Sequence, residues 1–217
     1  MFRNIKPLPI ALMAFICLPL FMECHGQSTQ PADCKLEYSR ASKSLNNYYR
    51  NKDDAQLAVA LREVDSAIQC GGTNSKAVQL KITLLLLSKK YKEGYDFVRP
   101  LDAAVFPRPY KKMMDENWFM AHVFEDSGDT LARDSLYKKI VTSVEHFIES
   151  ENAAKTPFDD MAYYDLFFVK GQFQRSKALE ELDELAKKYP SKKDFFVVLR
   201  GMIDNKDSVS TSEAQAQ

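Results

Sequence analysis

Glycine and proline, the residues that most often interrupt regular secondary structure, are scarce in this sequence. Seven Gly and nine Pro are spread over 217 residues. A fold of many short strands needs frequent tight turns, and such turns depend on these two residues. Apolar residues recur instead at spacings of three and four positions, which place them on one face of a helix. The sequence therefore predicts an all-α fold in which helices alternate with short polar breaks.

The chain also lacks an excess of either charge. Its 30 Lys and Arg residues are matched by 30 Asp and Glu residues. Proteins that bind nucleic acid or an anionic membrane concentrate basic residues near the phosphates. The charge balance therefore gives no reason to expect nucleic acid or a membrane surface as the partner.

Motifs of common enzymes are absent as well. The sequence has no GxSxG nucleophile motif, no HExxH zinc motif and no glycine-rich loop that could hold phosphates. After position 26 the only histidines are His122 and His146, and neither begins a recognised metal-binding pattern. Glu125 and Asp126 follow His122, but one His with two carboxylates on a helix is more typical of a solvated face. We expect no metal, no cofactor and no enzymatic activity.

The first 26 residues have the pattern of a secretory signal peptide. Arg3 and Lys6 form a short positive region, and the apolar run 7–22 follows. This run has 16 residues and three prolines, whereas a membrane-spanning helix needs about 20 apolar residues. A cleavage site follows Gly26. We therefore expect a bacterial protein that is exported to the periplasm or the cell surface and keeps no membrane span.

Lipid anchoring is the alternative for this segment. Cys24 would become the lipidated N-terminus, as in bacterial lipoproteins. Glu23 precedes it at a position where those proteins carry a small residue. Cleavage after Gly26 therefore fits the sequence better.

Only two cysteines remain beyond the signal peptide. Cys34 begins the first predicted helix, and Cys70 ends the second. The start of one helix lies beside the end of the next in an antiparallel hairpin, and two cysteines in an exported protein usually form one bond. We therefore predict a structural disulfide between Cys34 and Cys70, worth about 3–4 kcal/mol of loop-closure entropy.

The predicted helices fill positions 33–204, between a polar lead (27–32) and a disordered tail (205–217). Their approximate ranges are 34–50, 54–70, 75–89, 91–101, 110–126, 130–148, 157–173, 176–188 and 191–204. Asp33 should cap the first helix, and Asp53 with Gln56 makes a capping-box pattern at the second. A longer loop is expected at 149–155, with Pro157 in the first helical position of the next helix. Ser191 and Asp194 make a capping-box pattern at the start of the last helix.

The helix pairs resemble the tetratricopeptide repeat (TPR) family, because they recur with a period of about 37–46 residues. The matching positions are Leu85, 90–94, Val98 and Leu101 in the second pair, Ala121, Phe124, 128–129, Tyr137 and Ile140 in the third, and Ala178, Leu182, Leu185 and Pro190 in the fourth. Gly94 takes the small-residue position of the family, whereas Ala132 and Gly171 are slightly out of place. The resemblance implies an α-solenoid of about four antiparallel hairpins with a C-terminal capping helix. An unrelated helical bundle would show the same amphipathic spacing.

The resemblance also implies a binding groove lined by the first helix of each pair. The corresponding positions are Ser42, Asn46, Tyr49, Gln79, Thr83, Trp118, His122, Glu125, Met161 and Asp165. Trp118 would anchor a peptide or protein partner there, or it would pack in the core. Ser42, Asp115 and Phe119 depart from the variety of the family that clamps a C-terminal carboxylate, although Asn46 matches it. We expect a non-enzymatic adaptor in the cell envelope.

Two other functions stay open at this point. The first is an immunity or inhibitor protein that neutralises an exported toxin or hydrolase. The second is a cell-wall enzyme similar to lytic transglycosylases, which use a catalytic Glu followed by Ser. Glu149-Ser150 is the only such pair after position 26, and the glycine-containing motif that follows in that family is absent.

Overall fold

The computed structural model describes residues 32–71 and 74–204, and these ranges are almost entirely helical. They contain the α-helices α1 (Ala32–Asn51), α2 (Asp54–Gly71), α3 (Ser75–Leu87), α4 (Tyr91–Val98), α5 (Lys111–Asp126), α6 (Thr130–Ala153), α7 (Asp160–Phe173), α8 (Arg175–Lys188) and α9 (Lys193–Asp204). Two single 3-10 turns, η1 (Ala103–Val105) and η2 (Pro190–Lys192), precede α5 and α9. No strand occurs in these ranges, which confirms the all-α prediction.

Three predicted segments fall outside the described residues. They are the signal peptide (1–26), the polar lead (27–32) except for Ala32, which begins α1, and the tail (205–217). Among the helices of 32–71 and 74–204, none is long and apolar enough to cross a membrane.

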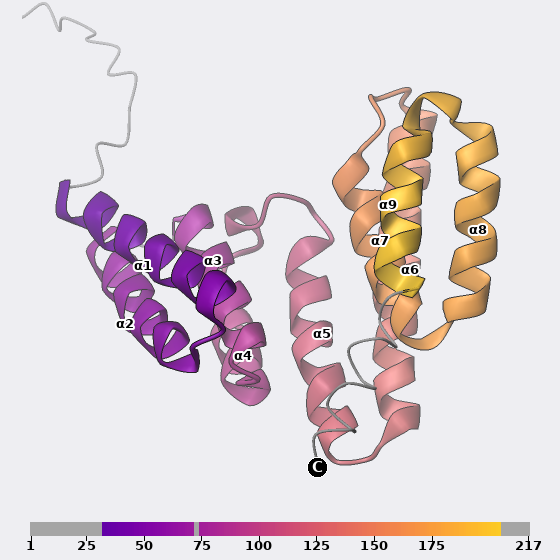
Figure 1. Ribbon diagram of the computed structural model, residues 1–217. Helices are drawn as coiled ribbons and strands as arrows, with labels where there is room; N and C mark the ends of the chain where they lie inside the picture. The colour runs from indigo at the N-terminus through magenta and orange to yellow at the C-terminus, as the bar shows by residue number, and fades with distance from the viewer. Residues whose placement is uncertain (1–31, 72–73, 205–217) are drawn as a thin grey trace, which may run out of the picture.

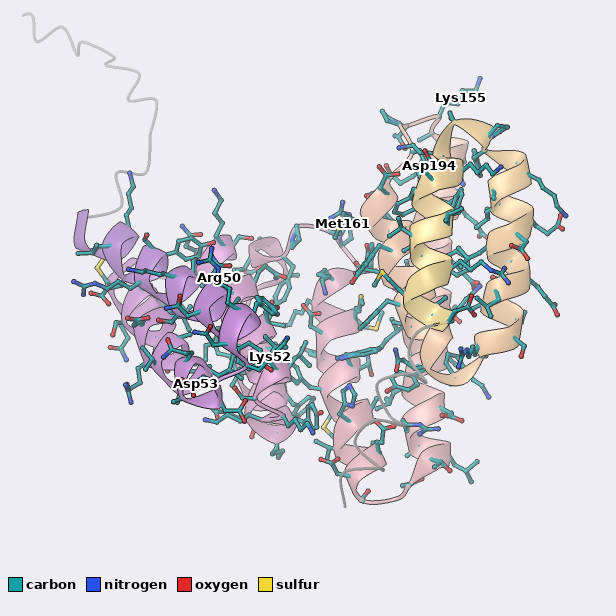
Figure 2. The ribbon with its side chains drawn as sticks, in the orientation of Figure 1. Arg50, Lys52, Asp53, Lys155, Met161 and Asp194 are labelled. Atoms are coloured by element: carbon teal, nitrogen blue, oxygen red, sulfur yellow. A yellow bond between two sulfur atoms is a disulfide. The ribbon has the colours of Figure 1, made fainter. Side chains whose placement is uncertain are left out.

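The first hairpin is closed covalently at its open end. Cys34 near the start of α1 is bonded to Cys70 near the end of α2, with their Cα atoms 5.4 Å apart. This confirms the predicted disulfide and requires the two helices to run antiparallel. At the turn the Asp53 carboxylate accepts the Ala55 N–H at 3.0 Å and so caps α2 as predicted. Figure 2 shows Asp53 beside Lys52, whose φ of 54° lets the chain reverse.

The predicted boundaries are wrong at the junction between α6 and α7. Residues expected to form a loop continue α6 to Ala153, and α7 begins at Asp160 instead of Pro157. Asp159 is the N-cap, because its carboxylate accepts the N–H groups of Met161 and Ala162 at 3.0 and 3.1 Å. A carboxylate that satisfies two orphan N–H groups fixes a helix start more firmly than a proline, which only avoids a penalty.

Three smaller predictions about helix ends are also wrong. Asp33 lies inside α1, so it does not precede the helix as its N-cap. The fourth helix is shorter than expected, since Asp102 accepts the Ala104 N–H at 2.8 Å and caps η1 instead. Ser191 lies within η2, so it does not form a capping box at the start of α9.

Buried apolar side chains form two clusters. In Figure 1, α5 lies between the helices α1–α4 and the helices α6–α9. The first cluster is mainly aliphatic and contains Ala41, Leu57, Ala60, Leu61, Val64, Ala77, Val78, Ile82, Leu84, Leu85, Val98, Phe106 and Phe119. The second cluster is rich in aromatic rings, including Tyr110, Trp118, Tyr137, Tyr163, Phe167 and Phe196. Because α5 gives Phe119 to the first cluster and Trp118 to the second, it belongs to both cores.

The contact between α4 and α5 depends on the glycine at position 94. A Cβ atom there would lie 2.1 Å from Cε1 of Phe119, whose ring is fully buried. No side chain fits in that space, because real Cβ atoms do not approach carbon atoms so closely. The small residue expected at Gly94 is therefore required by packing against α5.

Candidate functional site

A pocket of about 370 Å³ lies where side chains of the two clusters meet. Its walls come from the odd-numbered helices α3, α5, α7 and α9, together with the first residue of α4. The lining residues are Leu86, Leu87, Tyr91, Trp118, His122, Phe167, Phe168, Gly171, Gln172, Leu199, Met202 and Ile203. We call this cavity the central pocket.

Aromatic rings form one side of the central pocket. The Tyr91 and His122 rings are stacked, with centroids 4.5 Å apart and an angle of 14° between their planes. Trp118 meets His122 edge-on at 5.2 Å and lies 5.0 Å from Phe168. The rings of Tyr164 and Phe168 stack in turn along α7. These contacts fix the orientation of each ring, because aromatic pairs favour stacked or edge-on geometry.

The helical period explains why α5 and α7 point into the pocket. Trp118 and His122 are four residues apart on α5, so they lie on one face. On α7, Phe168 and Gln172 have the same spacing, and Gly171 lies between them. A Cβ atom at Gly171 would lie 3.1 Å from Cγ1 of Ile203, so the glycine allows α9 to approach α7 and close the pocket.

The pocket is apolar inside and polar at one edge. Trp118 is 6% exposed, whereas Phe168 and Met202 are 38% and 42% exposed at the rim. His122 Nδ1 lies 3.0 Å from Glu125, which also pairs with Arg133 at 3.2 Å. Burial, and then the nearby charges of Asp126 and Glu125, raise the pKa of Tyr91. Tyr91 therefore stays a neutral hydrogen-bonding group at physiological pH.

Trp118, His122 and Glu125 are the predicted groove residues that the structure brings together. Trp118 and His122 line the central pocket, and Glu125 holds His122 at the edge. Trp118 is also a buried member of the second cluster. Trp118 is therefore a core residue that also lines the central pocket, and its role as an anchor for a partner stays a prediction.

The other predicted groove residues lie away from the central pocket. Asn46, Tyr49 and Met161 are exposed, and Ser42, Gln79 and Thr83 are partly buried. Thr83 donates to the Gln79 carbonyl oxygen at 3.0 Å, and the Ser42 hydroxyl donates to the Tyr38 carbonyl at the same distance. Figure 2 shows Met161 near the start of α7.

Asp165, also predicted for the groove, belongs to a polar network between α5 and α7. It is buried, and it accepts a hydrogen bond from the Tyr110 hydroxyl at 3.0 Å. Arg108 makes two hydrogen bonds to Asp159, at 2.7 and 2.8 Å. The Arg108 guanidinium lowers the pKa of Asp159, whereas burial raises the pKa of Asp165. The network joins the segment before α5 to the start of α7.

Asp115 is the second buried carboxylate of this region. Lys111 pairs with one of its oxygens at 2.5 Å, while the other oxygen is buried with no hydrogen-bond partner among the described residues. Burial raises the Asp115 pKa to about 6, although the Lys111 charge opposes that rise. Near neutral pH the group therefore ionises at a cost to stability.

Part of the central pocket could not have been found from the sequence. Phe167, Phe168, Met202 and Ile203 carry no motif, and they meet only because α9 folds back on α7. The one available signal was the Phe167–Phe168 pair, because two adjacent large rings on a helix cannot both point into a single core.

Among residues 32–71 and 74–204, no group of three or more His, Cys, Asp or Glu side chains could hold a metal ion. Glu149, the residue of the cell-wall enzyme alternative, is exposed on α6. In comparisons with known proteins, no family model, no curated protein and no solved structure matches the chain.

Proposed function

We propose that this chain is a TPR-like binding module that takes an apolar side chain of a peptide or protein partner into the central pocket. The observation that carries the proposal is the aromatic wall formed by Tyr91, Trp118, His122 and Phe168 beside an open, apolar rim. In the TPR family the first helix of each pair lines the ligand groove. The central pocket takes its walls from α3, α5 and α7, which would be the first helices of their pairs in the proposed solenoid, and from α9, which would be its capping helix.

The size and chemistry of the pocket favour a single anchor residue over a large cofactor. About 370 Å³ lies near the lower end of the range for ligand pockets. Apolar walls with a Trp at their centre are typical of the spots that dominate binding energy in protein interfaces. Gln172 and His122 provide polar groups at the edge, where the backbone of a bound peptide would pass.

Export is the second part of the proposal. The signal-like segment at 1–26 and the disulfide between Cys34 and Cys70 favour an oxidising compartment, because such bonds persist outside the cytosol. N-terminal sequencing of the protein purified from its source would test this. A chain that begins at Gln27 supports export with cleavage, and a chain that retains Met1 contradicts it.

Selection of peptides from a random displayed library tests the binding function. Selected peptides should share an apolar anchor, and they should lose binding to Phe168→Glu, which places a charge at the rim. Leu131→Glu is the matched control, because Leu131 on α6 is an apolar residue that is 85% exposed and lies outside the pocket. The proposal fails if both variants bind equally well, or if no peptide is enriched.

A further inference from the structure

We propose a second interaction surface, a groove that binds an amphipathic helix with a basic polar face. The groove has a volume of about 810 Å³ and lies between α6 and α8, with α7 as its floor. Its lining residues are Glu145, Ile148, Glu149, Tyr163, Leu166, Phe167, Lys170, Lys177, Glu180, Glu181, Asp183, Glu184, Leu185 and Lys187. We call it the acidic groove. Phe167 lines both the acidic groove and the central pocket.

The floor of the acidic groove is apolar. Tyr163, Leu166 and Phe167 of α7 lie between Ile148 of α6 and Leu185 of α8. Two helices that flank a third leave room for one more helix, which would pack its side chains into the space between them. A helical partner would therefore lay its apolar face on this floor, as amphipathic helices do in other grooves.

The rims of the groove are acidic. Six carboxylates and three lysines line it, and each lysine pairs with a carboxylate of the groove. Lys170, which is buried, is held between Glu145 at 2.7 Å and Glu181. Lys177 pairs with Glu181 at 3.8 Å, and Lys187 pairs with Glu184 at 2.7 Å. The negative charge that remains is therefore available to a partner.

That charge is concentrated in two residues on opposite walls. In the part of the chain that the structure describes, Glu149 on α6 and Glu180 on α8 have no ion pair or side-chain hydrogen bond. Asp183, by contrast, is paired with Arg200 at 2.6 Å. An apolar floor between two unpaired carboxylates complements a helix that has Lys or Arg on both sides of an apolar stripe. This charge complementarity selects the basic amphipathic helix as the occupant.

A synthetic peptide pair tests the proposal on the purified protein. The probe is a fluorescein-labelled amphipathic helix of Leu and Lys, about 18 residues long so that it can form a helix. Its counterpart has Glu in place of every Lys. We expect the Leu/Lys peptide to bind with a micromolar Kd in fluorescence anisotropy, and the Leu/Glu peptide not to bind.

Charge reversal locates the site. The double variant Glu149→Lys with Glu180→Lys should bind the Leu/Lys peptide roughly tenfold more weakly. The matched control is Glu93→Lys with Asp96→Lys on the exposed surface of α4, which changes the net charge equally and should keep the Kd within about twofold of the wild type. Equal losses in both variants would mean general attraction between charges, and would overturn the proposal, as would no binding at all.

Hydrogen exchange provides a readout that does not depend on the variants. Peptide binding to the wild type should slow backbone exchange in 145–149 and 177–187, and Phe168→Glu should leave that binding unchanged. Protection confined to the central pocket, or a loss of binding in Phe168→Glu, would show that the probe occupies the other cavity. Failure of this second surface is therefore distinguishable from failure of the proposed function.

Discussion

The two halves of the molecule differ in the residues that form their cores. Helices α1–α4 enclose a mainly aliphatic core, and the bond between Cys34 and Cys70 joins α1 to α2. Helices α5–α9 enclose an aromatic core, and they contain the buried charged residues Asp115, Asp165 and Lys170. Both cavities described above take most of their walls from this second half.

We interpret this difference in core composition as a division of roles, in which one half provides stability and the other half provides binding surfaces. Aliphatic side chains pack at high density in few conformations, and the disulfide limits the unfolded chain, so the first half is suited to rigidity. Aromatic rings leave gaps at their edges but provide large contact surfaces for a partner. Buried charges and cavities weaken a fold, and they are commonly found where a protein binds something. We infer that α1–α4 support a surface that α5–α9 provide.

Removal of the disulfide should cause the largest loss of unfolding free energy, and it should destabilise mainly the first half of the molecule. The double variant Cys34→Ala with Cys70→Ala should lose about 3–4 kcal/mol of unfolding free energy in urea, because the unfolded chain regains the entropy of a long loop. Hydrogen exchange should accelerate most in α1 and α2. Equal acceleration in α8 and α9 would show that the two halves unfold as one unit.

A methyl group added at the contact between α4 and α5, which joins the two halves, should cause the next largest loss of unfolding free energy. Gly94→Ala should cost about 2–3 kcal/mol, because the new methyl group overlaps the buried Phe119 ring. Urea unfolding measures the loss. Gly201→Ala is the matched control, since nothing lies within 4 Å of its Cβ position in α9. That change should stabilise the protein by up to about 1 kcal/mol through helix propensity. A neutral Gly94→Ala would mean that α5 can move away from α4 freely.

The buried carboxylate at position 115 should make the second half sensitive to pH. The pKa of Asp115 in the folded protein, about 6, exceeds its ordinary value of 3.8. The folded state therefore holds this proton more tightly than the unfolded state, and stability falls as the pH rises from about 4 to about 6. Asp115→Asn removes this dependence.

Urea unfolding of the wild type and Asp115→Asn at several pH values measures the effect. The wild type should lose about 2 kcal/mol relative to the variant between pH values of about 4 and 7. Parallel pH profiles would show that Asp115 keeps an ordinary pKa in the folded protein.

The smallest change in unfolding free energy is expected for a substitution of Lys170, although this residue is buried. Lys170→Met should change the unfolding free energy by less than about 1 kcal/mol, because an apolar side chain of similar length replaces an ion pair that was costly to desolvate. The carboxylates of Glu145 and Glu181 are partly exposed and can be hydrated once the lysine is gone. A loss above about 2 kcal/mol in urea would show that the ion pair is a net stabiliser.

The sequence was sufficient where local chemistry decides the structure. Helical periodicity predicted the all-α fold, and the ranges of α3, α5 and α8 agree within a few residues. The disulfide followed from the positions of Cys34 and Cys70 in one hairpin. Each of these features depends on residues that are close in sequence or on a simple antiparallel pairing.

Features that depend on residues far apart in the sequence could not be predicted from it. Asp159 caps α7 while it is held by Arg108, which lies 51 positions earlier, and this moved the helix start away from Pro157. The central pocket needs α9 to return to α7, and no pattern in either helix encodes that approach. The acidic groove needs α6 and α8 to flank α7, which periodicity alone does not specify.

The emission of Trp118 tests the central claim most directly. It is the only Trp in the chain and it lines the central pocket, so its fluorescence reports occupancy of that site alone. Titration with a peptide selected for binding should shift the emission and slow acrylamide quenching, with the same Kd that anisotropy of the labelled peptide gives. A peptide that binds while Trp118 emission and quenching stay unchanged would place the binding site elsewhere and contradict the account.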